Sequence, residues 1–280
     1  METGRASRTA LRVAIRRAAH QVMDRPCVLA DPVAVPLLGA HFKLDREREA
    51  YPVARAFRAF MAARSRHAEE QLAKAVASGA RQYVVLGAGL DTFAYRNPFA
   101  GLRVFEVDFP ATQEWKRAFL AEADIPAPDN LTFVPLDFEH RTLAEGLDEA
   151  GFDSRVPAFF GWLGVVPYLT LAGFRATLRA IARQANGSGV CFDYGLAPES
   201  LSPARRMAFE ALAARVAAAG EPFQLFFTPD TLEAELREAG FSTIEHVDSE
   251  QLNALYFRDR SDGLQLPPEG LGMMATAWLD

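Results

Sequence analysis

Glycine and acidic residues follow two consecutive apolar runs at a spacing that could hold a nucleoside. The first run, Tyr83–Leu86, enters a turn that contains Gly87, Gly89 and Asp91. The glycines let the backbone turn tightly and approach a ligand closely. About twenty residues further on, a second apolar run ends at Asp108, where a Rossmann-type sheet carries the acid that accepts hydrogen bonds from ribose hydroxyls. We therefore expect a nucleoside-containing cofactor.

The turn also distinguishes between two cofactor classes. A dinucleotide fingerprint has a third glycine where this chain has Thr92, and the turn contains no Lys or Arg to bind phosphate. A bound pyrophosphate would lie close to Asp91, and the two anions would repel each other. S-adenosylmethionine has no phosphate and carries a sulfonium and an ammonium, so the turn favours it over NAD. For Asp91 alone, capping of the next helix is an equally good interpretation.

An acidic residue and an aromatic residue follow the third apolar run, Leu131–Pro135. The carboxylate of Asp137 could accept a hydrogen bond from the adenine amine, and the ring of Phe138 could stack on the base. The alternative is an ordinary strand-end cap. Because Asp137 continues the series of residues at strand ends, we favour the adenine site.

The fourth apolar run and its exit, residues 158–169, are rich in aromatic side chains. Such a segment suits a methyl-transfer pocket, where little water should compete with the acceptor. The alternative is a buried core strand, which we expect for Phe159 and Phe160. Trp162 and Tyr168 are the candidates for the acceptor pocket.

Arg64 and Arg66 precede the first strand, and either guanidinium could bind a carboxylate through two hydrogen bonds. On composition alone, a solvated helix face is the simpler interpretation. The five histidines show no metal-ligand spacing, and Cys27 and Cys191 suggest neither a zinc site nor a disulfide framework. No metal is expected, and no hydrolase, ATPase or metalloprotease motif occurs.

Composition indicates a globular chain. Of its 280 residues, 50% are hydrophobic and 24% charged, and the formal net charge is −6. This charge disfavours nucleic acid as the main partner. No run suits a bilayer span or a secretory signal, so we expect no membrane partner and a cytoplasmic location. The basic residues at 5–17 predict an amphipathic helix with a solvated basic face.

Apolar runs alternate with helical patterns from about residue 81, which predicts a parallel sheet covered on both faces. Residues 1–76 are expected to form a helical extension or lid, and residues 77–280 the α/β domain with a helical insertion at 197–227. Gly87, Asp108, Asp137 and Leu163 would meet at the carboxyl ends of the strands, where such sheets bind ligands. The seven predicted strands are 82–86, 103–107, 131–135, 158–163, 189–194, 243–247 and 273–279.

From about Thr9 to its end, the chain resembles the leucine carboxyl methyltransferase family, in the bacterial branch that includes O-methyltransferases of polyketide tailoring. The block L-G-A-G-L-D-T at 86–92 is quite specific for the family. The resemblance implies a class I methyltransferase fold, Rossmann-like with seven strands, the last antiparallel. The other markers are Arg64-Ser65-Arg66, Gly79–Val85, Ala94-Tyr95-Arg96, Phe105–Pro110, Lys116 and Leu136-Asp137-Phe138.

The resemblance also implies roles for single residues. Gly87 and Gly89 would approach the methionine part of S-adenosylmethionine, and Arg64 or Arg66 would pair with its carboxylate. The chain departs from the family in having Phe93 for a frequent Arg. It also has Leu163 where protein-carboxyl methylating members have Glu, which weakens the inference of a protein substrate. The complete set of candidate cofactor-binding residues is Arg64, Arg66, Gly87, Ala88, Gly89, Asp91, Asp108, Phe109, Asp137, Phe138 and Leu163.

We therefore expect an S-adenosylmethionine-dependent methyltransferase that acts on an oxygen of a small-molecule carboxylate or hydroxyl. No residue stands out as a general base, which tilts the expectation toward a carboxylate or an acidic phenol. Two alternatives stay open: an NAD(P)-dependent oxidoreductase, and a non-catalytic member that binds a partner through the insertion. The sequence does not give the acceptor or the oligomeric state.

Overall fold

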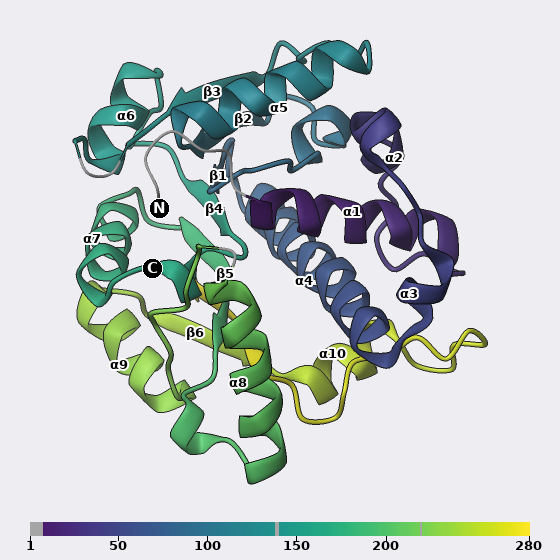
Figure 1. The fold of residues 1–280 in the computed structure, drawn as a ribbon. Coiled ribbons are helices and arrows are strands. Elements are labelled where there is room, and N and C mark those ends of the chain that lie inside the picture. Colours follow the sequence, from purple (N-terminus) through teal and green to yellow (C-terminus); the bar gives the residue numbers. More distant parts are fainter. Residues whose placement is uncertain (1–7, 138–139, 219) are drawn as a thin grey trace.

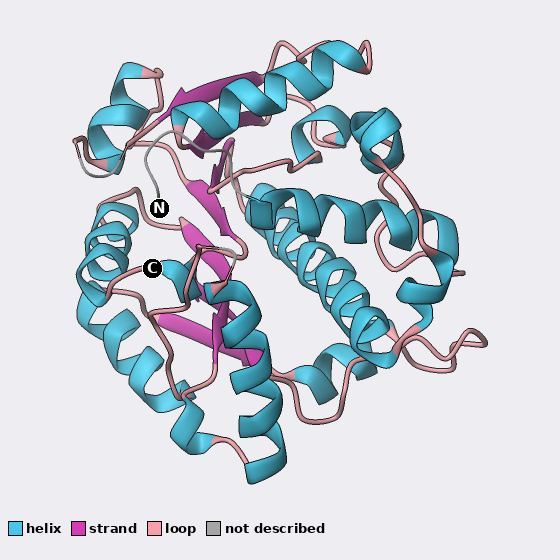
Figure 2. Ribbon diagram, in the orientation of Figure 1, coloured by secondary structure: helices cyan, strands magenta, loops and turns pink. Residues whose placement is uncertain are grey.

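A seven-stranded sheet forms the centre of the molecule (Figures 1 and 2). The structure is a computed structural model, and it describes residues 8–137, 140–218 and 220–280. The strand order is β3-β2-β1-β4-β5-β7-β6, and β7 runs antiparallel to both of its neighbours. The predicted fold and all seven predicted strands are confirmed, with ends that differ by one residue at most. The strands are β1 (Gln82–Leu86), β2 (Arg103–Asp108), β3 (Leu131–Pro135), β4 (Ala158–Trp162), β5 (Gly189–Gly195), β6 (Thr243–Val247) and β7 (Gly272–Trp278).

The central strands are apolar because both faces of the sheet are covered. Every residue of β1 and β4 is buried. Val84 and Val85 belong to different core clusters, on opposite faces of the sheet. Phe159 and Phe160 have no exposed surface, as predicted for core positions. Figure 2 shows the helices on both sides of the strands.

Capping residues explain where several helices begin and end. In α9, Thr228 and Thr231 form a capping box, Pro229 takes the first position, and Gly240 ends the helix with φ of +110°. The helices are α1 (Arg8–Met23), α2 (Ala34–Leu38), α3 (Arg46–Ala50), α4 (Pro52–Ala77), α5 (Pro110–Glu122), α6 (Leu143–Glu149), α7 (Leu171–Ala182), α8 (Pro203–Ala217), α9 (Pro229–Ala239) and α10 (Ser249–Tyr256).

The N-terminal helices pack directly on the sheet domain. Helix α4 contacts β4 and β5, and α1 contacts α2 and α4 (Figure 1). The insertion contains α8, and its last residues form hydrogen bonds with the segments that follow β4 and β5. The amide of Gln224 donates to Pro167 at 2.7 Å, and Ala197 donates to Phe227 at 3.0 Å. No helix within the described ranges combines the length and apolarity that a membrane crossing requires.

Candidate functional site

The chain changes direction across the sheet at β1, because β2 lies on one side of it and β4 on the other. In an open α/β sheet, a ligand binds at the carboxyl ends of the strands beside such a switch point. Gly87, Asp108 and Leu163 follow or end these three strands. The structure therefore brings these candidates to one edge of the sheet, as the sequence predicted.

Two glycines shape the loop after β1. Gly87 and Gly89 have φ of +65° and +50°, which residues with a Cβ adopt only at a cost. A Cβ on Gly87 would also overlap Cγ2 of Val165, in the loop after β4. The amides of Gly87 and Ala88 both donate to Val107, at 2.8 and 3.1 Å. The loop is thus tied to β2, and its path requires glycine.

Asp108 ends β2 beside this loop. One carboxylate oxygen accepts a hydrogen bond from the Gly89 amide at 2.5 Å, and the other accepts one from the Phe109 amide at 2.7 Å. Burial raises the pKa of the Asp108 carboxyl, although the two amides and a hydrogen bond with the Thr112 side chain act in the opposite direction. An ionised carboxylate has about four lone-pair sites, so Asp108 can still accept a hydrogen bond from a ribose hydroxyl. Phe109, half-buried, precedes α5.

Asp137 is half-buried just beyond β3, the strand next to β2. Its carboxylate contacts Nδ1 of His140 at 3.1 Å. The amide of Leu136 donates to the Asp108 carbonyl at 2.9 Å, which keeps the two strand exits close together. Phe138, the predicted adenine-stacking residue, lies outside the described residues.

The two candidate arginines have different environments. Arg66 is exposed and pairs with Glu70 at 2.7 Å. Arg64 is buried, so the solvated helix face expected from composition is wrong for it. It pairs with Asp193 at 3.0 Å, and its Nε has no hydrogen-bond partner among the described residues. A buried N–H without a partner costs free energy unless a ligand satisfies it.

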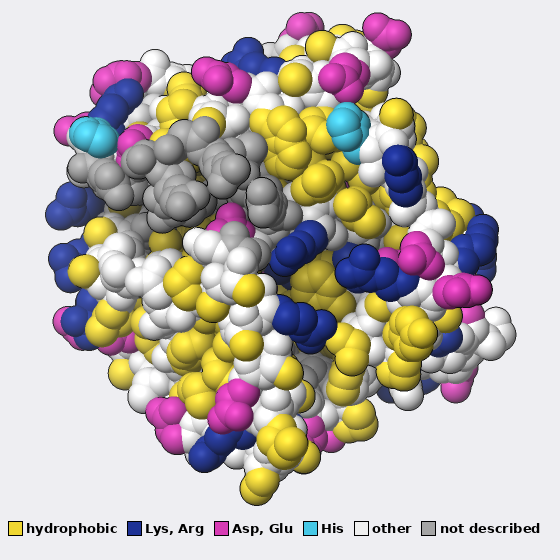
Figure 3. Space-filling view, in the orientation of Figure 1, with side chains coloured by type: hydrophobic (Ala, Val, Ile, Leu, Met, Phe, Trp, Pro, Cys, Tyr) yellow, Lys and Arg dark blue, Asp and Glu magenta, His cyan; other side chains and the backbone are white. Residues whose placement is uncertain are grey.

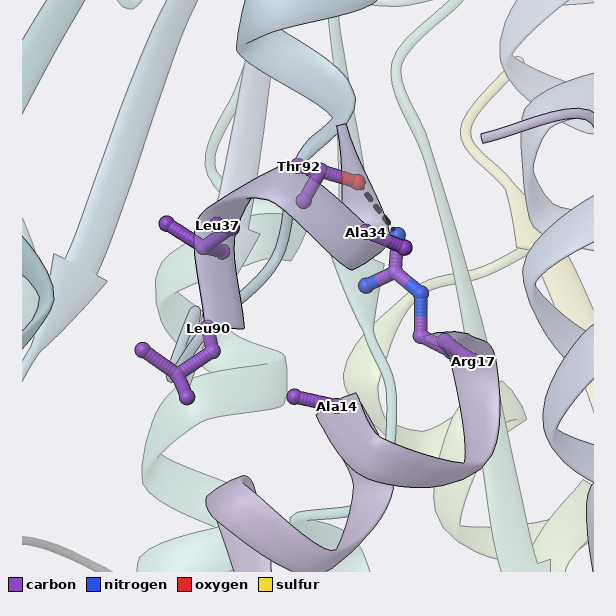
Figure 4. A pocket seen from close by; sticks show the side chains of 6 residues that line it. All are labelled: Ala14, Arg17, Ala34, Leu37, Leu90 and Thr92. Atoms are coloured by element: carbon purple, nitrogen blue, oxygen red, sulfur yellow. Dashed lines mark hydrogen bonds between the residues drawn. The ribbon is translucent and has the colours of Figure 1, made fainter. Parts of the chain in front are cut away.

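The carboxylate of Asp91 is already engaged by the protein. One oxygen accepts from the Phe93 amide at 2.7 Å, and the other pairs with Arg17 of α1 at 3.0 Å. Arg17 also binds Asp31 and Thr92, each at 2.6 Å. Figure 4 shows its guanidinium pointing from α1 toward Thr92. Burial tends to raise the pKa of Asp91, but Arg17 and other cations outweigh it and hold that pKa low.

Arg17 corrects the prediction of a fully solvated basic face on the first helix. Arg17 is only 5% exposed, and the neighbouring Arg16 forms an ion pair with Glu49. Arg12, by contrast, is exposed. This role could not be predicted from local spacing, because the partners Asp31 and Asp91 are distant from Arg17 along the chain.

At the end of β4, some of the predicted pocket residues belong to the core. Trp162 is 2% exposed and stacks on Phe174 with ring centres 5.5 Å apart, so we assign it to the core and not to an acceptor pocket. Leu163 is half-buried beside the second core cluster. Tyr168 is also half-buried, and burial raises the pKa of its hydroxyl to about 12. Its ring lies 5.2 Å from that of Phe223 in the insertion.

Comparisons with known proteins agree with this geometry. A sequence profile of the leucine carboxyl methyltransferase family matches residues 10–182. YktD of Bacillus subtilis, provisionally named an S-adenosyl-L-methionine-dependent methyltransferase, is 32% identical over 293 aligned positions, which cover 94% of this chain and 95% of YktD.

Two solved structures share the fold. One, provisionally described as a methyltransferase from Thermobifida fusca, has a TM-score of 0.58 at 21% identity, over 88% of this chain and 92% of that one. The other, a DUF574 family protein from Streptomyces avermitilis, has a TM-score of 0.57 at 17% identity, over 96% and 97% of the two chains.

Proposed function

This chain belongs to the leucine carboxyl methyltransferase family, and from that premise we propose that it transfers the methyl group of S-adenosylmethionine to an oxygen of a small organic molecule. The observation that carries the proposal is the pairing of the Gly89 amide with Asp108 at the switch point of the sheet. It places a carboxylate that can accept a further hydrogen bond beside a loop whose path requires glycine. Such an arrangement suits a ribose diol next to an amino-acid moiety.

The chain's own residues fit the cofactor. Asp108 would accept hydrogen bonds from the ribose hydroxyls, and Asp137 one from the adenine amine. Nε of Arg64, which has no hydrogen-bond acceptor in the described part of the chain, would find one in the methionine carboxylate. Arg66 points to solvent and pairs with Glu70, so we assign the carboxylate to Arg64. We assign Asp91 to the loop's own support, since Arg17 and Phe93 already occupy its oxygens.

The proposed mechanism asks mainly for alignment and exclusion of water. When bound, the cofactor supplies an electrophilic methyl group. The protein would hold the acceptor oxygen in line with it, an effect that can contribute several orders of magnitude in rate. The half-buried Tyr168 and Phe223 offer an apolar wall for the acceptor. A carboxylate acceptor is ionised at neutral pH and needs no base, whereas an alcohol would need one.

Surface charge favours an acidic acceptor. Figure 3 shows Lys and Arg side chains around an apolar area, in the part of the view that lies between the labels α1, α4 and α8 in Figure 1. Basic side chains around an apolar area attract an organic anion although the whole chain carries a net charge of −6. Leu163, where protein-carboxyl methylating relatives have Glu, also leads us to propose a small-molecule acceptor.

The test is incubation with methyl-labelled S-adenosylmethionine and a panel of organic carboxylates and phenols. We expect labelled product with members of this panel. Mild base distinguishes the acceptor atom, because it releases methanol from a methyl ester and leaves an aryl ether intact. Cofactor binding without transfer to any acceptor would favour a non-catalytic role. Enhanced NAD(P)H fluorescence on mixing, with no binding of S-adenosylmethionine, would favour an oxidoreductase.

A further inference from the structure

Asp193 joins three elements at the carboxyl end of β5. One oxygen accepts a hydrogen bond from the Gly164 amide at 2.6 Å, in the loop after β4. The other pairs with Nη1 of Arg64 on α4 at 3.0 Å. The side chains of Arg64 and Asp193 are 7% and 9% exposed, so both charges are largely removed from water. One carboxylate thus fixes the arginine and the adjacent loop.

The loop passes directly beside the guanidinium. Gly164 has φ of +72°, and a Cβ there would lie 2.9 Å from Nη1 of Arg64. A guanidinium presents its donors as a rigid planar fork that can hold a carboxylate by two parallel bonds. Asp193 occupies Nη1, whereas Nε lies buried with no acceptor anywhere in residues 8–137, 140–218 and 220–280. Asp193 therefore holds Arg64 through Nη1, while the buried Nε donor is left for a ligand.

We propose that Asp193 is a positioning residue, which orients Arg64 so that its Nε side receives the α-carboxylate of the cofactor's methionine part. This inference rests on the proposed function, because it requires S-adenosylmethionine or its product as the ligand. Asp193 would act through Arg64, without contact with the reacting atoms. Its contribution is the orientation that the guanidinium already has before the ligand arrives.

Coulombic attraction alone would act in the opposite direction. Asp193 is negative, so its removal would increase the net attraction between Arg64 and a second carboxylate. Against this, a buried guanidinium without its partner is costly and turns toward water or another acceptor. Because Arg64 has a long flexible side chain, we expect the lost orientation to outweigh the gained charge. The sign of the measured change decides between the two.

Two ligands separate this role from general damage to the site. S-adenosylhomocysteine contains the amino-acid group, whereas 5′-methylthioadenosine has the same nucleoside without it. Asp193→Asn keeps an oxygen for the Gly164 amide but removes the charge facing Arg64. We expect its affinity for S-adenosylhomocysteine to fall about tenfold or more, the scale of a charged hydrogen bond, with less than about a twofold change for 5′-methylthioadenosine.

The matched control is Asp24→Asn. Asp24 is buried and pairs at 2.7 Å with Arg58, which precedes Arg64 on the same helix α4. We expect this variant to bind both ligands like the wild type. A double-mutant cycle then tests action through Arg64: in an Arg64→Gln background, Asp193→Asn should change affinity for S-adenosylhomocysteine by less than about twofold.

The outcomes are distinct. Wild-type protein that binds neither ligand overturns the proposed function itself. Wild-type binding with an unchanged or tighter affinity for S-adenosylhomocysteine in Asp193→Asn, or an equal loss for both ligands, overturns the positioning role alone. If Asp193→Asn does not fold, Asp193→Glu is measured instead. It keeps the charge but displaces it by one methylene, and it must show the same selective loss.

Discussion

The backbone amide of Gly89 donates a 2.5 Å hydrogen bond to the carboxylate of Asp108. The bond joins the loop after β1 to the end of β2, so it holds these two segments together without a ligand. A Cβ on Gly89 would also lie 3.1 Å from Cβ of Ala10, which places the first helix against the same loop. The proposed nucleoside site is therefore built jointly by two strands and α1.

Replacing Asp108 with Ala should weaken binding of S-adenosylhomocysteine about ten- to hundredfold, since hydrogen bonds between the ribose and a charged acceptor are lost. Affinity for 5′-methylthioadenosine should fall equally, because both ligands contain the ribose. Calorimetry measures both. Asp153→Asn, in the loop before β4 at the opposite edge of the sheet, is the control. Unchanged affinity in Asp108→Ala would remove the ribose assignment.

Gly87→Ala should impair cofactor binding and reduce stability. The new methyl group would meet Val165, and the residue would keep an unfavourable φ of +65°. Val165→Ala should restore part of the loss in the double variant by making room, while the backbone strain persists. Urea unfolding and calorimetry report the two effects. Strictly additive losses in the double variant would show that the two side chains do not collide.

Arg17→Met should destabilise the fold by about 1.5–3 kcal/mol, because Asp31 and Asp91 would lose the charged hydrogen bonds of Arg17. Arg96 would remain 3.5 Å from Asp31, so this carboxylate would keep one cation. The control is Arg12→Met on the exposed face of the same helix, where a change within about 0.5 kcal/mol is expected. Denaturant unfolding at neutral pH measures both free energies. A loss at position 17 as small as that at position 12 would mean that the ion pairs contribute little.

Acid should destabilise the protein partly through Asp24. Burial alone would raise the pKa of this carboxyl, but His20 and Arg58 lower it from 3.8 to about 2. Between pH 3.8 and about 2, Asp24 therefore binds a proton more readily in the unfolded chain than in the folded chain. The stabilisation is present above pH 3.8 and is lost as the pH falls through about 2. Unfolding free energies of the wild type should fall more steeply there than those of Asp24→Asn, and parallel curves would contradict this.

The positions of the strands could be predicted from local sequence patterns. Strands such as β1 and β4 could be located from sequence because burial on both faces leaves an uninterrupted apolar run. Residues at the strand ends could also be placed, since parallel strands put their carboxyl ends on one edge. Residue preferences at helix caps account for the ends of α9 at Thr228 and Gly240.

The polar connections could not be predicted, because they join residues distant along the chain. Arg17 meets Asp91 and Arg64 meets Asp193 through tertiary packing, which no local spacing encodes. A buried ion pair, Glu106 with Lys116 at 2.5 Å, also escaped prediction. Its glutamate lies inside β2, and burial raises the pKa of that carboxyl to about 7. Helical periodicity alone cannot tell such a buried arginine or lysine from a solvated one.

The central claim is that the loop after β1 binds the nucleoside of S-adenosylmethionine. Isothermal titration of the wild-type protein with S-adenosylhomocysteine tests it most directly. We expect saturable, stoichiometric binding, competed by S-adenosylmethionine. A folded protein that shows no binding of either ligand at high micromolar concentration would contradict the account.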